Sequence, residues 1–336
     1  MDEFASEILF GSTGLVTRRA ALDQGIAAET VDRLVRRGEW VAVRRGVYAR
    51  RAYVDARVTR DDRQRLHDDA ACLRISGSHV RSHESAAVVL GMPVLLPGAP
   101  VTHVTRADVH GSRHEHGVKH HGAPYRPDQV REIDGIRVLD PARTALDIAR
   151  EHGAVRGVVA MDSALRRGVS RDDLCQAFSE MRCWPYSTEV RAALDHCDPR
   201  SDSVAESLGR LLVARLGRGR PQTQFGLASD GKVAYVDLRI GRHLIEVDGK
   251  VKYQRDGPAG RTADEVVWDE KLRQDWLCGF KLGMSRLTWT DVYGPGQAAA
   301  LVRLEREVSD TEARFGTDIT DLAPYIVPRP RRRTWL

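Results

Sequence analysis

Acidic residues at positions 237–248 have types and spacing that could carry out chemistry. The apolar runs 233–238 and 243–247 flank a glycine and are predicted to form the two strands of a hairpin. Side chains alternate between the two faces of a strand, so Glu246 and Asp248 share one face. Asp237, on the partner strand, can then lie across from them.

Three carboxylates on one face repel each other and are costly to bury without a cation. A hard divalent ion such as Mg²⁺ (or Mn²⁺) relieves that cost and prefers oxygen ligands. The pattern therefore predicts a metal site with Asp237, Glu246 and Asp248 as ligands, and metal-assisted hydrolysis of a phosphodiester as its chemistry. Each carboxylate alone also has an ordinary structural interpretation, since Asp248 precedes a glycine as turn residues often do.

The elements that must position these carboxylates are predicted from residue 199 onward. Asp202 or Ser203 caps a helix that carries a leucine stripe, with Glu206 in its first turn. Three strands follow, and then a helix over 264–279. The last elements are a strand and a further helix, so the predicted order is α-β-β-β-α-β. Exposed positions are expected on the 264–279 helix at Asp269, Lys271, Arg273 and Asp275.

This order and its acidic residues resemble the PD-(D/E)XK nuclease superfamily, in particular the branch related to very-short-patch-repair endonucleases. The matching motifs are SVAESLGRLLVARLG, the strand with Gln224, YVDLRIGRHLIEVDGK and EKLRQDWLCGFKLGMSRLTW, within about residues 200–295. The resemblance implies a restriction-endonuclease-like core with Asp237 as the central metal ligand and Glu206 joining from the side. Glu246 and Asp248 would be the two carboxylates of the E-x-(D/K) element.

The E-x-K lysine of that superfamily is missing, because Asp248 occupies its position. The catalytic lysine implied by the resemblance is then Lys250, two residues further on, or Lys271 on the following helix. A metal site without a positioned lysine could bind DNA without cutting it.

Residues 11–50 are predicted to form a winged helix-turn-helix. Thr17 caps a helix over 18–24, a second helix spans 28–37, and two short strands follow. Arginines gather where such a module meets phosphates, although a solvated basic helix in a small structural domain is the alternative. The candidate DNA-binding residues are Arg33, Arg36, Arg37, Arg44 and Arg45.

Two parts of the chain resemble AbiEi-family antitoxins. LVTRRAALDQGI and RLVRRGEWVAVRRGVYA match the N-terminal domain of that family, and SHESAA, THVT and DGIRVLDPARTALDIAR match its second domain. The resemblance implies a winged helix that binds operator DNA and represses its own operon. It also implies a middle domain that supports partner binding, with a cognate toxin as the candidate partner.

Histidines at 110, 114, 116, 120 and 121 resemble a metal box, but closed ligand pairs are missing and a solvated basic hairpin is favoured. His83-Glu84 is interpreted as part of a helix N-terminus rather than a catalytic pair.

The whole sequence sets broad limits. The chain has 336 residues, a formal net charge of +5 and 42% apolar residues. It contains no run long enough to span a membrane, no signal-peptide pattern, and five cysteines without a CxxC pair, so a cytoplasmic location is expected. The predicted division is a winged helix-turn-helix (1–60), a mixed α/β middle domain (61–198), a nuclease-like domain (199–305) and a C-terminal extension (306–336) with a disordered basic tail.

The sequence favours a DNA-binding protein of mixed α/β (α+β) fold with Mg²⁺-dependent endonuclease activity. The alternative is an antitoxin-like transcriptional regulator with a catalytically degenerate nuclease fold. RNA as the substrate ranks lower, because no aromatic RNA-recognition motif is present. DNA is the expected partner, no membrane is, and the oligomeric state and enzymatic competence stay open.

Overall fold

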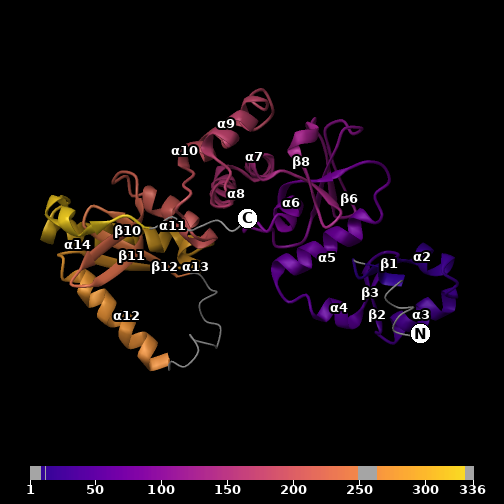
Figure 1. Ribbon diagram of the computed structural model, residues 1–336, viewed down its shortest axis with the longest axis horizontal. Helices are drawn as coiled ribbons and strands as arrows, with labels where there is room; N and C mark the ends of the chain where they lie inside the picture. The colour runs from indigo at the N-terminus through magenta and orange to yellow at the C-terminus, as the bar shows by residue number, and fades with distance from the viewer. Residues whose placement is uncertain (1–8, 12, 249–262, 330–336) are drawn as a thin grey trace. The chain divides into compact units, whose positions relative to one another are not determined.

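The computed structural model describes residues 9–11, 13–248 and 263–329, so Lys250 and residues 330–336 of the predicted disordered tail lie outside the described residues. Arg329, within that predicted tail, is described and forms an ion pair with Asp202 at 2.6 Å. The fold is mixed α/β, as predicted, with helices and three sheets. The chain forms two compact units (Figure 1). The first contains residues 1–151 and 176–181, and the second contains 152–175 and 182–336. The four-part division expected from the sequence stays a prediction.

The first sheet of the first unit has the elements expected of a winged helix-turn-helix. Its three antiparallel strands lie in the order β1-β3-β2. Thr17 Oγ1 accepts a hydrogen bond from the Ala20 amide at 3.0 Å, the predicted cap of α2, and Gly25 turns the chain at φ +83°. The elements are β1 (Leu15–Thr17), α2 (Arg18–Asp23), α3 (Ala28–Arg36), β2 (Trp40–Arg44), β3 (Val47–Arg50) and α4 (Arg51–Asp55).

The second sheet of this unit has six strands in the order β6-β7-β5-β4-β9-β8. The parallel pairs are β5 with β7 and β4 with β9, and the other neighbours are antiparallel. A capping box at Thr59 starts α5, and α6 packs against β5. The elements are α5 (Arg60–Cys72), β4 (Val80–Arg81), α6 (His83–Val89), β5 (Thr102–Arg106), β6 (Ser112–Glu115), β7 (Val118–Gly122), η1 (Pro127–Gln129), β8 (Val130–Ile133), β9 (Ile136–Leu139) and α7 (Pro141–His152).

The second unit contains the predicted α-β-β-β-α-β order as α11, β10, β11, β12, α12 and β13. Its sheet has the order β13-β12-β11-β10-β14, with β12 and β13 parallel. In Figure 1, the N-terminal end of α12 extends away from this sheet. Helix α14 continues past residue 305, where the sequence predicted the end of the nuclease-like domain. The strands are β10 (Gln222–Ser229), β11 (Lys232–Ile240), β12 (His243–Asp248), β13 (Gly283–Thr288) and β14 (Ile326–Val327). The helices are α8 (Ala154–Arg166), α10 (Ser187–His196), α11 (Val204–Ala214), α12 (Ala263–Cys278), α13 (Trp289–Val292), α14 (Gln297–Phe315) and η3 (Thr320–Tyr325). Helix α9 (Arg171–Ser179) begins in the second unit and ends in the first.

A buried ion pair joins α8 to α11 within the second unit. Arg210 donates to Asp162 at 2.6 Å, and the two side chains are 4% and 0% exposed. The other oxygen of Asp162 accepts from the Asp198 amide at 2.6 Å, and Arg210 Nε donates to Ser201 Oγ at 3.1 Å. These bonds compensate for the cost of burying the charges of Asp162 and Arg210, and they hold α8 against α11.

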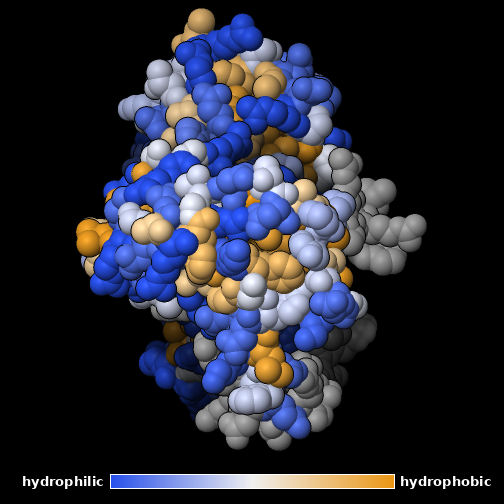
Figure 2. Space-filling model, turned by 90° about the vertical axis from the view of Figure 1, so that its left-hand side faces the viewer, coloured by the Kyte–Doolittle hydropathy of each residue, from blue (hydrophilic) through white to orange (hydrophobic). Residues whose placement is uncertain are grey.

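Residues 176–181 return to the first unit after the chain has entered the second. Glu180 accepts a hydrogen bond from Gln129 at 3.3 Å and forms an ion pair with Arg126. In the part of the chain that the structure describes, no helix is both long and apolar enough to cross a membrane. Polar residues predominate on the face shown in Figure 2, and apolar residues occur there in small groups.

Candidate nucleic-acid interface and carboxylate cluster

Helix α3 has a buried apolar face and an exposed basic face. Val31 is fully buried, and Leu34 and Val35 pack against the same small core that contains Trp40. With 3.6 residues per turn, Arg33, Arg36 and Arg37 fall on the opposite side, and all three are exposed. This is the face that the second helix of a helix-turn-helix presents to a DNA groove.

The turn between β2 and β3 carries the other two candidate arginines. Arg45 is exposed, whereas Arg44 is half-buried and donates to the backbone carbonyl of His116 at 2.6 Å. That carbonyl lies on the turn of the β6–β7 hairpin in the same unit. Arg44 therefore attaches the wing to the neighbouring sheet, a structural contact that its place in a basic run did not indicate.

A second contact missed from the sequence locks the helix-turn-helix. Arg18 donates to both oxygens of Asp32, at 2.6 and 3.1 Å, and to the Tyr48 hydroxyl at 3.3 Å. The hydrogen bonds from Arg18 lower the pKa of Asp32. Arg18 begins α2 and Asp32 lies in α3, so this pair fixes the angle between the two helices.

In the second unit, the carboxyl groups of Asp237 and Glu246 lie close enough for the charge of one to affect the other. Asp237 Oδ2 accepts from the Val247 amide at 2.8 Å, and Glu246 Oε1 accepts from Arg273 at 2.6 Å. Burial and the charge of Asp237 raise the pKa of Glu246 to about 7. Two carboxyl groups this close must share a proton or a cation.

Arginines supply the cations around these carboxylates. Glu246, Arg273 and Glu270 form a chain of ion pairs at 2.6 and 3.2 Å. Arg286 continues it, with Glu270 at 2.8 Å on one side and Asp248 at 3.4 Å on the other. The structure thus brings Asp237 and Glu246 together and gives Asp248 an arginine partner.

The expectation that Arg273 is exposed was wrong, because its side chain is only 28% exposed and reaches Glu246. Lys271 is exposed, and its ammonium lies 5.8 Å from the Trp268 ring. Two positions along a helix are separated by about 200°, so Lys271 and Arg273 cannot both face the sheet. Among the described residues, the cation from α12 beside Glu246 is therefore Arg273 rather than Lys271, and the helix periodicity of 264–279 was the signal that could have found it.

Glu206 is held at the N-terminus of α11 by a set of polar contacts. It is 8% exposed and accepts from the Asp202 amide at 2.7 Å and from Ser203 Oγ at 3.0 Å. Gln224 of β10 donates to it at 2.9 Å. Burial raises the pKa of Glu206. Its contacts with Asp202 and Ser203 are those of a helix cap, and the one with Gln224 attaches α11 to the sheet.

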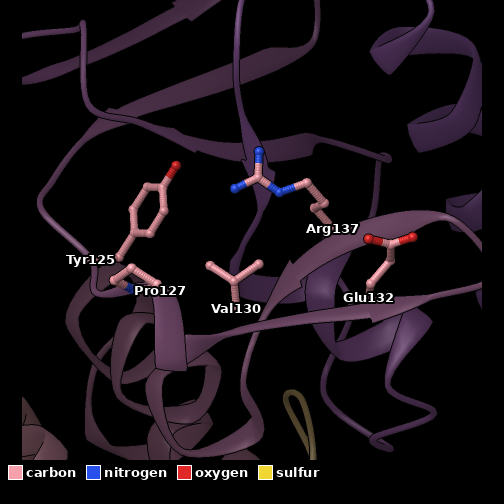
Figure 3. A pocket seen from close by; sticks show the side chains of 5 residues that line it. All are labelled: Tyr125, Pro127, Val130, Glu132 and Arg137. Atoms are coloured by element: carbon pink, nitrogen blue, oxygen red, sulfur yellow. The ribbon is translucent and has the colours of Figure 1, made fainter.

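A shallow pocket of about 300 Å³ lies over β8 and β9 in the first unit. Figure 3 shows Tyr125 and Arg137 with Val130 between them, and Glu132 beside them. Arg137 and Glu132 are cross-strand neighbours, and Arg137 donates to Ser78 at 3.2 Å. These residues were not singled out from the sequence.

The comparisons with known proteins bear on the first of these sites. Residues 7–51 match the family described as "Transcriptional regulator, AbiEi antitoxin", and residues 70–196 match "AbiEi antitoxin C-terminal domain". Two parts of the chain are thus similar to AbiEi antitoxin domains. The first match contains the whole helix-turn-helix and four of the five candidate arginines named above lie on its exposed surface.

The curated relatives cover less of the chain. An uncharacterized protein of Mycobacterium tuberculosis, found in two strains, is 24% identical over 155 residues, which is 44% of this chain and 55% of the relative. The UDP-N-acetylmuramoylalanine--D-glutamate ligase of Paraburkholderia phymatum is 27% identical over 135 residues, which is 38% of this chain and 24% of the ligase. The chain thus spans about half the length of the mycobacterial relative.

The second AbiEi match ends at residue 196, so neither match includes Glu206, Asp237, Glu246 or Asp248. The predicted nuclease resemblance therefore depends on the motifs and the element order of residues 200–295 alone.

Replacing Glu246 with glutamine is expected to flatten the dependence of stability on pH. A carboxyl group whose pKa is about 7 in the folded protein and near 4.5 in the unfolded chain binds more protons in the folded state. Its contribution to the free energy of unfolding therefore falls as pH rises from about 4.5 to 7. Between pH 5 and pH 8 the variant should therefore lose less stability than the wild type does. In the variant, Arg273 still has its ion pair with Glu270, at 3.2 Å, and its hydrogen bond to the Tyr235 carbonyl, at 2.7 Å.

Urea unfolding of both proteins at pH 5, 6, 7 and 8 measures this difference. Glu270→Gln is the matched control, because it removes an equal charge from a more exposed position in the same ion-pair chain. Parallel pH profiles for the wild type and Glu246→Gln would contradict the raised pKa.

Proposed function

We propose that the protein is a DNA-binding transcriptional regulator of the AbiEi antitoxin type. The observation that carries this proposal is the exposed basic face of α3, within residues 7–51 that match an antitoxin regulator family. Arginine binds phosphate through two parallel hydrogen bonds and keeps its charge at every physiological pH. A helix with this face is suited to the phosphates that border a major groove.

The other contacts of this region support the same proposal. The Arg18–Asp32 pair fixes α2 against α3, and Arg44 holds the wing through the carbonyl of His116. A DNA-reading helix must be held at a defined angle, because base and phosphate contacts depend on its placement in the groove. A cognate toxin is the proposed second partner, on the strength of the antitoxin likeness alone.

Titration of the full-length protein with DNA from upstream of its own gene tests the proposal. Specific binding should be at least 10³-fold tighter than binding to a scrambled duplex of equal length, with log K falling linearly with log salt concentration. A reporter fused to the same upstream DNA should be repressed when the protein is expressed. Equal affinity for both duplexes, without repression, would contradict operator recognition.

Mg²⁺-dependent cleavage of DNA is the second candidate function. The close approach of Asp237 and Glu246 favours it, because such a pair suits one shared cation. The fit to a nuclease metal is incomplete. Arg273 already binds Glu246, Arg286 pairs with Asp248, and the superfamily's lysine position is Asp248 itself. Mg²⁺ or Mn²⁺ would have to compete with two guanidinium groups, so we place this function second and derive no step through the ion.

A cleavage assay on plasmid, mismatched and single-stranded DNA separates the two candidates. With the site neutralised by arginine, we expect no nicking above background with Mg²⁺ or Mn²⁺. Nicking that needs the metal and is abolished in both Asp237→Ala and Glu246→Ala would overturn that expectation. Glu270→Ala is the control, since it lies in the same ion-pair chain and is not a predicted metal ligand.

A further inference from the structure

Three histidines from separate elements converge in the first unit. His83 begins α6, His103 lies in β5 and His121 lies in β7. One ring nitrogen of each histidine lies within 4.8 Å of the corresponding nitrogens of the other two. The sequence expectation that the histidine run is solvated holds for the exposed residues His110, His114 and His116. It is wrong for His120, which is buried, and for His121, which stacks on His83.

The sheet register explains this convergence. Strands β5 and β7 are parallel, with His103 opposite Lys119. His121 follows Lys119 by two residues, so His103 and His121 project from the same face of the sheet. The amide of His103 donates to Ser85 Oγ of α6 at 2.8 Å, which attaches the helix to β5. His83, at the start of α6, is thereby brought over the two strand histidines.

The three rings pack closely. His83 and His121 are stacked with centroids 3.9 Å apart, and His103 Nδ1 lies 3.0 Å from His121 Nε2. His83 and His103 are only 3% and 2% exposed. Such burial disfavours the imidazolium form, and it lowers the pKa of His121 far below its usual value. Neutral imidazole is the form that binds metal ions.

We propose that His83, His103 and His121 form a binding site for a transition-metal ion of the zinc type. Imidazole nitrogen is a preferred ligand of Zn²⁺, and three histidines with one open position are an established zinc arrangement. In a tetrahedral site with Zn–N bonds of about 2.1 Å, the ligand atoms stand about 3.4 Å apart. The 3.0 Å separation of His103 Nδ1 from His121 Nε2 is close to that value. Because His83 and His121 stack with near-parallel planes, at least one of these rings must rotate to point its nitrogen at the ion.

Neighbouring polar groups select the nitrogen that each ring offers. Ser82 Oγ lies 2.9 Å from His83 Nδ1, and a hydrogen bond there directs Nε2 to the ion. Glu84 lies 3.7 Å from His103 Nε2, a position from which a carboxylate favours the tautomer that offers Nδ1. The assigned ligand atoms are thus His83 Nε2, His103 Nδ1 and His121 Nε2.

The backbone at His83 is a separate observation that points to the same place. His83 has φ +51°, in the left-handed region that residues other than glycine seldom adopt. Strained backbone of this kind is retained where the surrounding structure requires one side-chain direction, and it concentrates at functional sites. Here the strain accompanies a histidine that is directed onto the other two rings.

Isothermal titration of the full-length, tag-free, chelator-treated protein with ZnCl₂ tests this site. The wild type should bind one Zn²⁺ per chain at the cluster. His121→Phe keeps a ring to stack on His83 but removes the ligand atom, and should weaken this binding at least 100-fold. The double variant His110→Ala/His114→Ala removes two exposed histidines from the same region and should bind as the wild type does. Ser82→Ala should weaken binding 10- to 100-fold.

A Co²⁺ titration of the wild type gives a result that does not depend on any variant. Occupancy of the cluster should produce the visible absorption of tetrahedral cobalt, and Zn²⁺ should remove it at one equivalent. The proposal is overturned if the wild type shows neither one-to-one Zn²⁺ binding nor this absorption. It is also overturned if a folded His121→Phe protein, checked by circular dichroism, binds Zn²⁺ as tightly as the wild type.

Discussion

Replacing Arg33, Arg36 and Arg37 together with alanine is expected to lower the affinity for operator DNA by about 100-fold or more at physiological salt. Each arginine that contacts a phosphate contributes about 1 kcal/mol and one unit of the dependence of log K on log salt concentration. The three side chains lie on the exposed face of α3, away from the buried Val31, so the winged helix should stay folded.

Electrophoretic mobility shifts at three salt concentrations measure both the affinity and the salt slope, which should fall by about three units. The triple variant Arg182→Ala/Arg191→Ala/Arg215→Ala is the matched control, because it removes the same charge from exposed positions outside the N-terminal segment. If both triple variants lose affinity equally, the effect reflects net charge, and α3 is not the DNA-reading helix.

The second large effect is expected at the buried ion pair between α8 and α11. Asp162→Asn keeps the shape of the side chain but leaves Arg210 buried without its counter-charge, and we expect the second unit to lose about 3–5 kcal/mol of stability. Burial already raises the pKa of Asp162, which shows that this site disfavours a charged group. The Arg210 charge should therefore be strongly destabilising once the Asp162 carboxylate is removed.

Chemical unfolding of Asp162→Asn, Arg210→Met and the double variant Asp162→Leu/Arg210→Met measures this pair. Because the double variant removes both charges together, it should recover most of the stability that each single change loses. Arg200→Met is the control, since its partner Asp198 is buried but the arginine itself is 58% exposed. A loss below about 1 kcal/mol in Asp162→Asn would show that water reaches the pair.

The sequence predicted most of the elements that position these sites, because periodicity, caps and turns are local properties. The cap at Thr17, the turn at Gly25 and the α-β-β-β-α-β order are examples. The approach of Asp237 to Glu246 was also predictable, since strand alternation determines which side chains share a face.

Contacts between distant segments were not predictable in the same way. The sequence offered Lys250 or Lys271 beside the carboxylates, whereas on α12 the residue that reaches Glu246 is Arg273, since helix phase decides between neighbouring charges. His121 was grouped with its neighbours in the sequence, whereas its partners His83 and His103 come from elements that only the sheet register brings together. Lys250 lies outside the described residues, so its part in the carboxylate site stays a prediction.

The return of residues 176–181 to the first unit has a consequence for how such a chain can be cut or recombined. The chain passes between the two units at 151/152, at 175/176 and again at 181/182. One cleavage by a protease therefore releases neither unit, and one crossover between genes cannot exchange either unit whole. A truncation at residue 198, just after the second AbiEi match ends, would also remove Arg210 and leave Asp162 without its counter-charge.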